Sequence, residues 1–176
     1  MVRILVVVCF VLVLAVPALA QDDYPKVEMA MGYANLGFPS LTTVDKIDHH
    51  SGFATHMSFN LSKNLGFENY TGIYGMGQGV TLISNIFGGK IMARFPRVVP
   101  FVVGGLGVGY FTQSSQGYVS SASSFAVRYG FGADVPMNDS MGIKIDVSRV
   151  GMGNPFFGNR TTNWNISTGV VFTLSN

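Results

Sequence analysis

Alternation of apolar and polar residues runs through almost the whole chain and strongly limits what it can fold into. The segment NWNISTGVVFTL shows the pattern clearly: an apolar or methyl-bearing residue occupies every second position from Trp164 to Leu174, and mostly polar residues such as Asn163 stand between them. A period of two is typical of a β-strand with one apolar and one polar face. In a soluble protein the apolar face turns toward a core, whereas in a membrane barrel it turns toward lipid.

The same alternation predicts an even number of strands along the chain. The eight predicted strands are residues 26–38, 51–61, 65–77, 82–95, 99–112, 123–136, 141–152 and 163–174. Each is as long as the roughly 9–11 residues that a tilted strand needs to cross a bilayer, or longer. Strands of ordinary globular proteins usually have about five or six residues. Strand length therefore favours a barrel that crosses a membrane.

The predicted connections differ in length on the two sides of such a barrel. On one side they are short and rich in turn-forming residues, at 62–64, 96–98 and 137–140. On the other side they are longer and polar, at 39–50, 112–122 and 153–162, with 78–81 as a short exception. Tight periplasmic turns and longer extracellular loops are typical of outer-membrane barrels. We therefore expect the short turns to face the periplasm.

The first twenty residues predict a cleaved secretory signal peptide. Arg3 precedes an apolar stretch over residues 4–16, and the segment ends in Ala18-Leu19-Ala20. This stretch is too short and wrongly flanked for a spanning helix, so an uncleaved anchor is the less favoured alternative. We expect a signal peptide over residues 1–20 and one barrel domain over residues 21–176.

Removal of the signal peptide also changes the chemistry of the chain. It removes Cys9, the only cysteine, so the exported chain forms no disulfide of its own. It also removes Arg3, leaving ten of the 11 Lys and Arg against nine Asp and Glu, a net charge of +1. This balance does not indicate a nucleic-acid partner. Charged residues make up only 11% of the chain, less than half of the roughly 25% of a soluble domain.

Charged residues fall on the polar face of the predicted strands, which in a membrane barrel faces the lumen. The predicted lumen charge network is Glu28, His56, Glu68, Lys90, Arg94, Arg128, Asp134, Lys144 and Asp146. Apart from the histidine, four of these side chains are basic and four are acidic. Buried charges persist only when they are paired, so this balance favours a closed lumen. The exception is Arg149, which falls on the apolar face near a loop.

Two further features follow from the same strand faces. If residues 138–140 form the loop between two paired strands, counting outward places Asp134 opposite Lys144, within reach of a salt bridge. An eight-stranded barrel has an interior that side chains just fill, which argues against an open porin. Aromatic residues near the strand ends predict interfacial girdles. They are Tyr33, Phe38, Phe53, Phe67, Phe95, Tyr110, Phe125, Trp164 and Phe172.

Two motifs that suggest cofactor chemistry are weak. Asp45, Asp48, His49 and His50 form a cluster with the residue types of a metal or acid–base site. A solvated loop tip is the favoured interpretation, so we expect no metal and no catalytic residue there. The glycine-rich segment 104–109 lacks the spacing of a dinucleotide-binding loop and continues as a strand. We expect no cofactor.

The final strand resembles a known assembly signal. Residues 167–174 have the pattern polar, any, Gly, any, any, aromatic, any, hydrophobic, in which Gly169, Phe172 and Leu174 are the matching positions. This pattern is similar to the C-terminal β-signal of bacterial outer-membrane proteins, although two residues follow it here. The chain as a whole resembles the small OmpA/OmpX-like barrels of the outer-membrane β-barrel domain family. The resemblance implies an eight-stranded antiparallel barrel inserted by the barrel-assembly machinery.

The sequence thus predicts an all-β transmembrane protein of the bacterial outer membrane, in contact with outer-membrane lipid and monomeric. Its expected role is structural, in the envelope, or interactive, through the extracellular loops, and not enzymatic. Two alternatives remain open. The first is a barrel enzyme that acts on lipids at the outer rim, which requires a nucleophile or water beside a positioned base. The second is a soluble lipocalin-like carrier of an apolar ligand.

Overall fold

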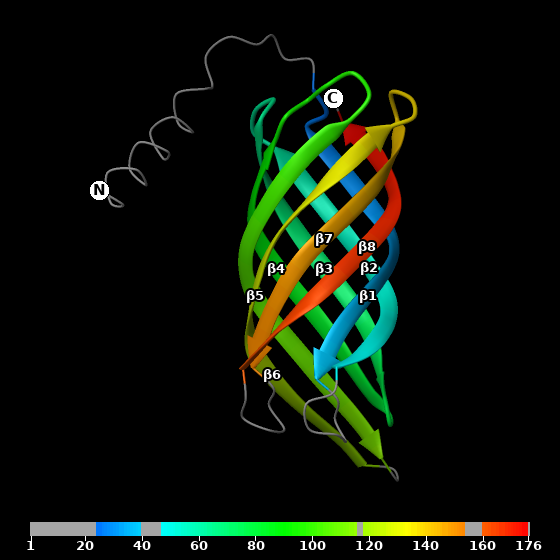
Figure 1. The fold of residues 1–176 in the computed structure, drawn as a ribbon, viewed down its shortest axis with the longest axis vertical. Helices are drawn as coiled ribbons and strands as arrows, with labels where there is room; N and C mark the ends of the chain where they lie inside the picture. Colours follow the sequence, from blue (N-terminus) through cyan, green and yellow to red (C-terminus); the bar gives the residue numbers. More distant parts are fainter. Residues whose placement is uncertain (1–23, 40–46, 116–117, 154–159, 176) are drawn as a thin grey trace, which may run out of the picture.

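The computed structural model describes residues 24–39, 47–115, 118–153 and 160–175, which form one closed barrel (Figure 1). Each strand pairs antiparallel with its neighbours in the chain, and β1 closes the barrel against β8. The strands are β1 (Val27–Pro39), β2 (Ile47–Asn60), β3 (Leu65–Gly77), β4 (Val80–Met92), β5 (Val99–Ser115), β6 (Tyr118–Pro136), β7 (Met141–Gly153) and β8 (Arg160–Ser175). The predicted eight-stranded, up-and-down antiparallel fold is confirmed.

The connections divide the barrel into two unlike ends. The short connections 61–64, 93–98 and 137–140 lie at the same end as the start of β1 and the end of β8 (Figure 1). We call this the turn end, and the opposite end the loop end. The hairpin of β5 and β6 reaches furthest at the loop end (Figure 1).

Several strands extend further toward the loop end than their hydropathy predicts. β2 begins at Ile47 instead of residue 51, and β6 begins at Tyr118 instead of residue 123. In the added part of β6, backbone pairing continues, with Gln113 opposite Ser120. Alternation of hydropathy is produced by the lipid on one side and the lumen on the other. Where both faces of a hairpin meet water, the pairing can continue without the pattern.

The turn between β3 and β4 is the tight exception at the loop end. Gly77, Gln78 and Gly79 all have positive φ, at 78°, 51° and 73°. Glycine adopts this backbone conformation without steric cost, so its presence on both sides of Gln78 explains how two strands reverse over so few residues.

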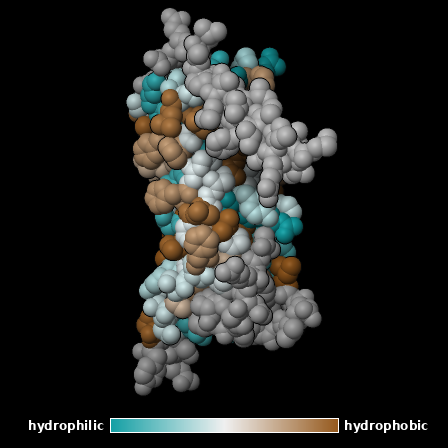
Figure 2. Space-filling view, turned by 90° about the vertical axis from the view of Figure 1, so that its left-hand side faces the viewer, coloured by the Kyte–Doolittle hydropathy of each residue, from teal (hydrophilic) through white to brown (hydrophobic). Residues whose placement is uncertain are grey.

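Large apolar side chains cover the outside of the barrel. Brown, hydrophobic residues are spread over the face that Figure 2 shows. Phe67, Phe87, Leu106, Phe125 and Phe131 are each more than half exposed. A soluble protein rarely exposes apolar surface so continuously, because water opposes it. Among the described residues, no helix is long and apolar enough to cross a membrane.

Candidate functional site: the lumen

The lumen receives every side chain of the predicted charge network. Eight of the nine side chains are buried, and Arg94 is partly buried at the turn end. They come from β1, β2, β3, β4, β6 and β7, together with Arg94 just after β4. Alternation along each strand explains this placement, because residues two apart face the same side. The same alternation sends further polar residues, outside the predicted charge network, into the lumen: Ser58, Asn60, Tyr70, Ser148, Asn165 and Ser167.

The β6–β7 hairpin holds the pair expected from counting outward from its turn. Asp134 lies opposite Lys144, and the ammonium nitrogen of Lys144 lies 3.1 Å from a carboxylate oxygen of Asp134. Lys90 of β4 donates a second hydrogen bond to Asp134, at 3.0 Å. Phe101 of β5 packs its ring against both ammonium groups, at 4.6 Å from Lys90 and 4.0 Å from Lys144. Sequence reasoning missed Lys90 as a partner because β4 and β6 are not adjacent.

Glu68 of β3 is the centre of the buried network. One carboxylate oxygen accepts a hydrogen bond from Arg128 at 3.0 Å and lies 3.2 Å from Nδ1 of His56. The other oxygen lies 3.5 Å from Lys144 and 4.0 Å from Lys90. A single carboxylate therefore contacts side chains from strands on several sides of the lumen. The contacts with Arg128 of β6 and Lys144 of β7 cross the lumen, because neither strand is adjacent to β3.

Arg128 of β6 joins this centre to a second carboxylate. Its guanidinium donates to Asp146 at 2.7 Å and to the hydroxyl of Ser148 at 3.2 Å. The guanidinium also lies 4.4 Å from the ring centre of Tyr70, a favourable cation–π distance. A planar group with five donors suits such a multiply bonded position better than lysine does.

At the turn end, Glu28 and Arg94 form a separate pair. Arg94 lies 3.3 Å from Glu28, which also accepts a hydrogen bond from Asn60 at 2.6 Å. This pair lies beside a cavity of about 490 Å³ that opens at the turn end and is lined in part by Tyr24, Glu28, Asp134 and Asp139. Of the lumen charges, Glu28 and Asp134 line this cavity.

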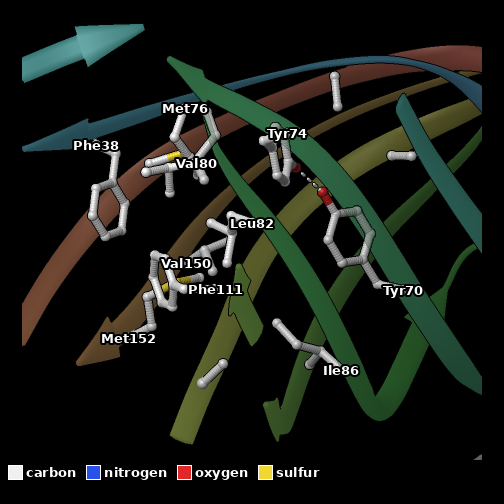
Figure 3. Close-up of a cluster of buried hydrophobic side chains, with 14 residues drawn as sticks. Phe38, Tyr70, Tyr74, Met76, Val80, Leu82, Ile86, Phe111, Val150 and Met152 are labelled. Atoms are coloured by element: carbon white, nitrogen blue, oxygen red, sulfur yellow. Dashed lines mark hydrogen bonds between the residues drawn. The ribbon is translucent and has the colours of Figure 1, made fainter. Parts of the chain in front are cut away.

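An apolar cluster fills the lumen toward the loop end. Figure 3 shows Phe38, Leu82, Phe111, Val150 and Met152 gathered from different strands, with the hydroxyl groups of Tyr70 and Tyr74 turned toward each other. The rings of Phe38 and Phe111 lie 5.8 Å apart. Tyr74 donates a hydrogen bond to Asn165 at 2.7 Å, which links the apolar cluster to the polar layer. We call this cluster the apolar plug.

Phe38 corrects the predicted aromatic girdle. It is fully buried in the apolar plug, because it shares the lumen face of β1 with Glu28. Of the other predicted girdle residues, Tyr33, Phe53, Phe67, Phe95, Tyr110, Phe125 and Trp164 are exposed on the outer surface, and Phe172 is partly buried. The position of a residue in the alternation therefore predicts whether it faces outward better than its distance from a strand end does.

Arg149 lies on the outer surface, as the alternation predicts. Its guanidinium lies 4.1 Å from the ring centre of Trp164 on β8. Stacking on an aromatic ring stabilises a cation that has little water around it. This contact gives the outward arginine a partner within the barrel wall.

The histidine cluster does not form a metal site in the described part of the chain. Asp48, His49 and His50 lie in β2, and Asp45 lies outside the described residues. His49 contacts Asn35 across the strand pair, at 3.2 Å. Among the described residues, no group of three or more His, Cys, Asp or Glu side chains is placed to hold a metal ion.

A different histidine has the geometry of a hydrolase relay. Nδ1 of His56 faces Glu68, and its Nε2 lies 3.3 Å from the hydroxyl of Ser167. Serine, histidine and a carboxylate in this order form the catalytic triad of many hydrolases. Here the serine and histidine are only 3% and 4% exposed, and Glu68 is shared with Arg128 and lysines. A nucleophile must reach its substrate, and this one lies beneath packed side chains.

The residues of the predicted assembly signal lie on β8, the strand that closes the barrel. Gly169 pairs with Gly32 of β1 and faces the lumen beside Ser167. Phe172 pairs with Met29 of β1 and Met141 of β7, and Leu174 is exposed beyond it. The glycine-rich segment 104–109 lies within β5, in agreement with its interpretation as strand.

Comparison with known proteins gives a consistent result. Residues 6–172 match the family model described as outer membrane protein beta-barrel domain. Among solved structures, Neisserial surface protein A (NspA) is similar with a TM-score of 0.66 at 12% identity, covering 84% of this chain and 96% of that one. The N-terminal β-barrel domain of Pseudomonas aeruginosa OprF gives 0.58 at 14% identity, covering 84% and 96%. Ail, the attachment invasion locus protein of Yersinia pestis, gives 0.53 at 19% identity, covering 83% and 97%.

These identities establish the fold and no more, and no curated protein matches the chain. The family match covers nearly the whole chain. The outward apolar face of the barrel, its charged lumen and its closed antiparallel sheet fit a barrel in a bacterial outer membrane. A soluble lipocalin-like carrier would need the opposite arrangement, with an apolar lumen and a polar exterior. The chain belongs to the outer membrane protein beta-barrel domain family.

Proposed function

We propose that this protein is a non-enzymatic structural element of the outer membrane that also offers its loop end for surface contacts. The filled lumen is the observation that carries the proposal. A layer of paired charges around Glu68 and the apolar plug above it occupy successive levels of the barrel. With its interior filled, such a barrel supplies a stable wall and a platform for loops rather than a route for solutes.

Conductance in planar lipid bilayers tests the absence of a pore. We expect no steady conductance steps from the purified, folded protein. As a positive control, Phe38→Ala combined with Phe111→Ala removes two rings from the apolar plug and should raise the frequency of open events. Steady conductance of the unaltered barrel would overturn the proposal.

Burial of the relay formed by Ser167, His56 and Glu68 disfavours an enzymatic role for it. A fluorophosphonate probe, which labels nucleophilic serines, is expected to leave Ser167 unlabelled in lipid vesicles. Lipid A and phospholipid supplied in the same vesicles should remain unmodified, with or without substitution of His49 and His50. Labelling of Ser167 that disappears in His56→Ala would instead support a hydrolase.

Export and assembly form the second part of the proposal. We propose that residues 1–20 are removed as a signal peptide and that the barrel-assembly machinery reads β8 through Gly169, Phe172 and Leu174. The apolar outer positions of Phe172 and Leu174 on the closing strand support this role. Mass spectrometry of protein from outer membranes should give an N-terminus at Gln21. A mass that includes residues 1–20 would contradict cleavage.

A further inference from the structure

A small polar patch interrupts the apolar outer surface on β2, β3 and β4. We define the outer polar patch as Thr55, Asn69, Thr71 and Asn85, which alternate with the lumen-facing residues of their strands. Thr55, Thr71 and Asn85 form one row across three strands, since Thr71 pairs with both of the others. Thr71 is the middle residue of the 13-residue β3, so the patch lies midway along this strand.

Three of these side chains form a closed ring of hydrogen bonds. Asn85 donates to Thr71 at 2.7 Å, Thr71 donates to Asn69 at 3.3 Å, and Asn69 donates to Asn85 at 3.3 Å. A carboxamide has two N–H donors, and the ring uses one from each asparagine. The second N–H of each asparagine takes no part in this ring.

Lipid cannot accept these hydrogen bonds. The hydrocarbon core contains neither water nor acceptors, so polar groups there are costly and are usually matched with polar groups of another segment. On β6 and β7, the corresponding outer positions are apolar, with Val127, Phe131, Ile143, Ile145 and Val147. Arg149 of β7 and Thr168 of β8 also face outward, and the patch differs from them because three of its side chains hydrogen-bond to one another.

Next to the patch, an exposed phenyl ring lies beside an area where the backbone carries no side chains. Phe87 of β4 is 65% exposed and is the most exposed aromatic side chain on the described surface. Two residues further along β4, Gly89 pairs with Gly104 of β5. Both glycines face outward, and a Cβ built at either would have nothing within 4 Å. A bare backbone area of this kind allows another surface to approach closely.

We propose that a second copy of this chain binds here, forming a symmetric dimer within the membrane. A twofold interface brings the same patch of both copies together, so it must be self-complementary. Each outer polar patch offers N–H donors and carbonyl and hydroxyl acceptors, which allows it to bond to an identical patch. Each copy also offers both Phe87 and the bare Gly89–Gly104 area that can receive the partner's phenyl ring. This proposal goes beyond the proposed structural role and replaces the sequence-based expectation of a monomer.

Cysteine cross-linking in outer membranes tests the proposal directly. Cys9 is the only cysteine and lies in the predicted signal peptide, so the exported chain provides a clean background. Ile83→Cys places a thiol on the outer face of β4, two residues from Asn85, and Ile145→Cys places one at the far side on β7. We expect a disulfide-linked dimer of twice the monomer mass from Ile83→Cys and none from Ile145→Cys.

Substitutions within the patch separate a specific interface from random collision. In the Ile83→Cys background, Asn85→Leu removes the same contact from both copies and should lower the dimerisation constant about tenfold, on the basis of hydrogen bonds between membrane helices. Gly104→Leu fills the bare area and should also lower cross-linking while leaving the hydrogen-bonded ring intact. Thr168→Val on the outer face of β8 is the matched control and should change nothing. Heat-dependent migration on gels verifies that each variant is folded.

Three outcomes would overturn the proposal. The first is equal cross-linking from Ile83→Cys and Ile145→Cys, which indicates random encounter. The second is a cross-linked dimer whose yield is undiminished in the Asn85→Leu and Gly104→Leu variants. The third is an adduct of Ile83→Cys with a different protein and no dimer, which would assign the patch to another partner.

Discussion

Loss of the Lys144 side-chain charge should destabilise the barrel strongly, and the structure gives the scale of the loss. Lys144 lies 3.1 Å from Asp134 and 3.5 Å from Glu68. Removal of one partner of a buried ion pair costs about 3–5 kcal/mol. Both carboxylates keep another cation, Lys90 at 3.0 Å from Asp134 and Arg128 at 3.0 Å from Glu68. We therefore expect Lys144→Met to lower the free energy of unfolding by about 3 kcal/mol, the low end of that range.

A double-mutant cycle isolates the pair. Asp134→Asn added to Lys144→Met should restore part of the loss, with a coupling energy of about 1–2 kcal/mol, since the second substitution makes the lumen charges equal in number again and leaves Lys90 4.0 Å from Glu68. Unfolding by guanidinium in lipid vesicles can be followed through Trp164, the only tryptophan in the chain. Lys63→Met, in an exposed turn, is the control and should leave the unfolding curve unchanged. A coupling energy near zero would refute the paired interior, because water would then be screening both charges.

Three further predictions concern topology, insertion and backbone conformation. A peptide tag inserted after Lys63 should be hidden from antibodies on intact cells and one after Gln78 accessible, and the reverse pattern would invert the orientation of the barrel. Phe172→Asp places a charge on the closing strand next to lipid and should prevent accumulation of heat-modifiable barrel in outer membranes; normal insertion would show that β8 is wrongly assigned. Gly79 has a φ of 73°, and a Cβ there would clash with the backbone oxygen of Ser114, so Gly79→Ala should lower the free energy of unfolding in denaturant by about 1–2 kcal/mol. Gly75→Ala meets open space and should be nearly neutral, and equal effects of the two substitutions would contradict the turn geometry.

The sequence predicted those features of the fold that depend on the alternation of apolar and polar residues along each strand. Alternation alone predicted the eight strands, the lumen position of the charged residues and the Asp134–Lys144 pairing across the β6–β7 turn. Alternation could not predict which side chains contact each other across the lumen. The approach of Lys90 to Asp134 and the position of Glu68 among four basic side chains depend on barrel curvature and strand tilt, which no local pattern records. Phe38 shows the same limit, since its type suggested the membrane interface but its parity placed it in the lumen.

The distribution of charge along the chain has a consequence for how such a barrel enters a bilayer. The β6–β7 hairpin brings two cations and two anions to the lumen, and two of its ion pairs, Arg128 with Asp146 and Asp134 with Lys144, lie within the hairpin itself. The lumen charges from the first half of the chain, Glu28, Glu68, Lys90 and Arg94, also sum to zero. Each half can thus approach hydrocarbon without net charge, before Glu68 meets Arg128 and Lys144. Neutrality of the lumen charges is built into the order of the chain, and closure adds the ion pairs of Glu68 with Arg128 and Lys144, which join its two halves, to those already within the hairpin.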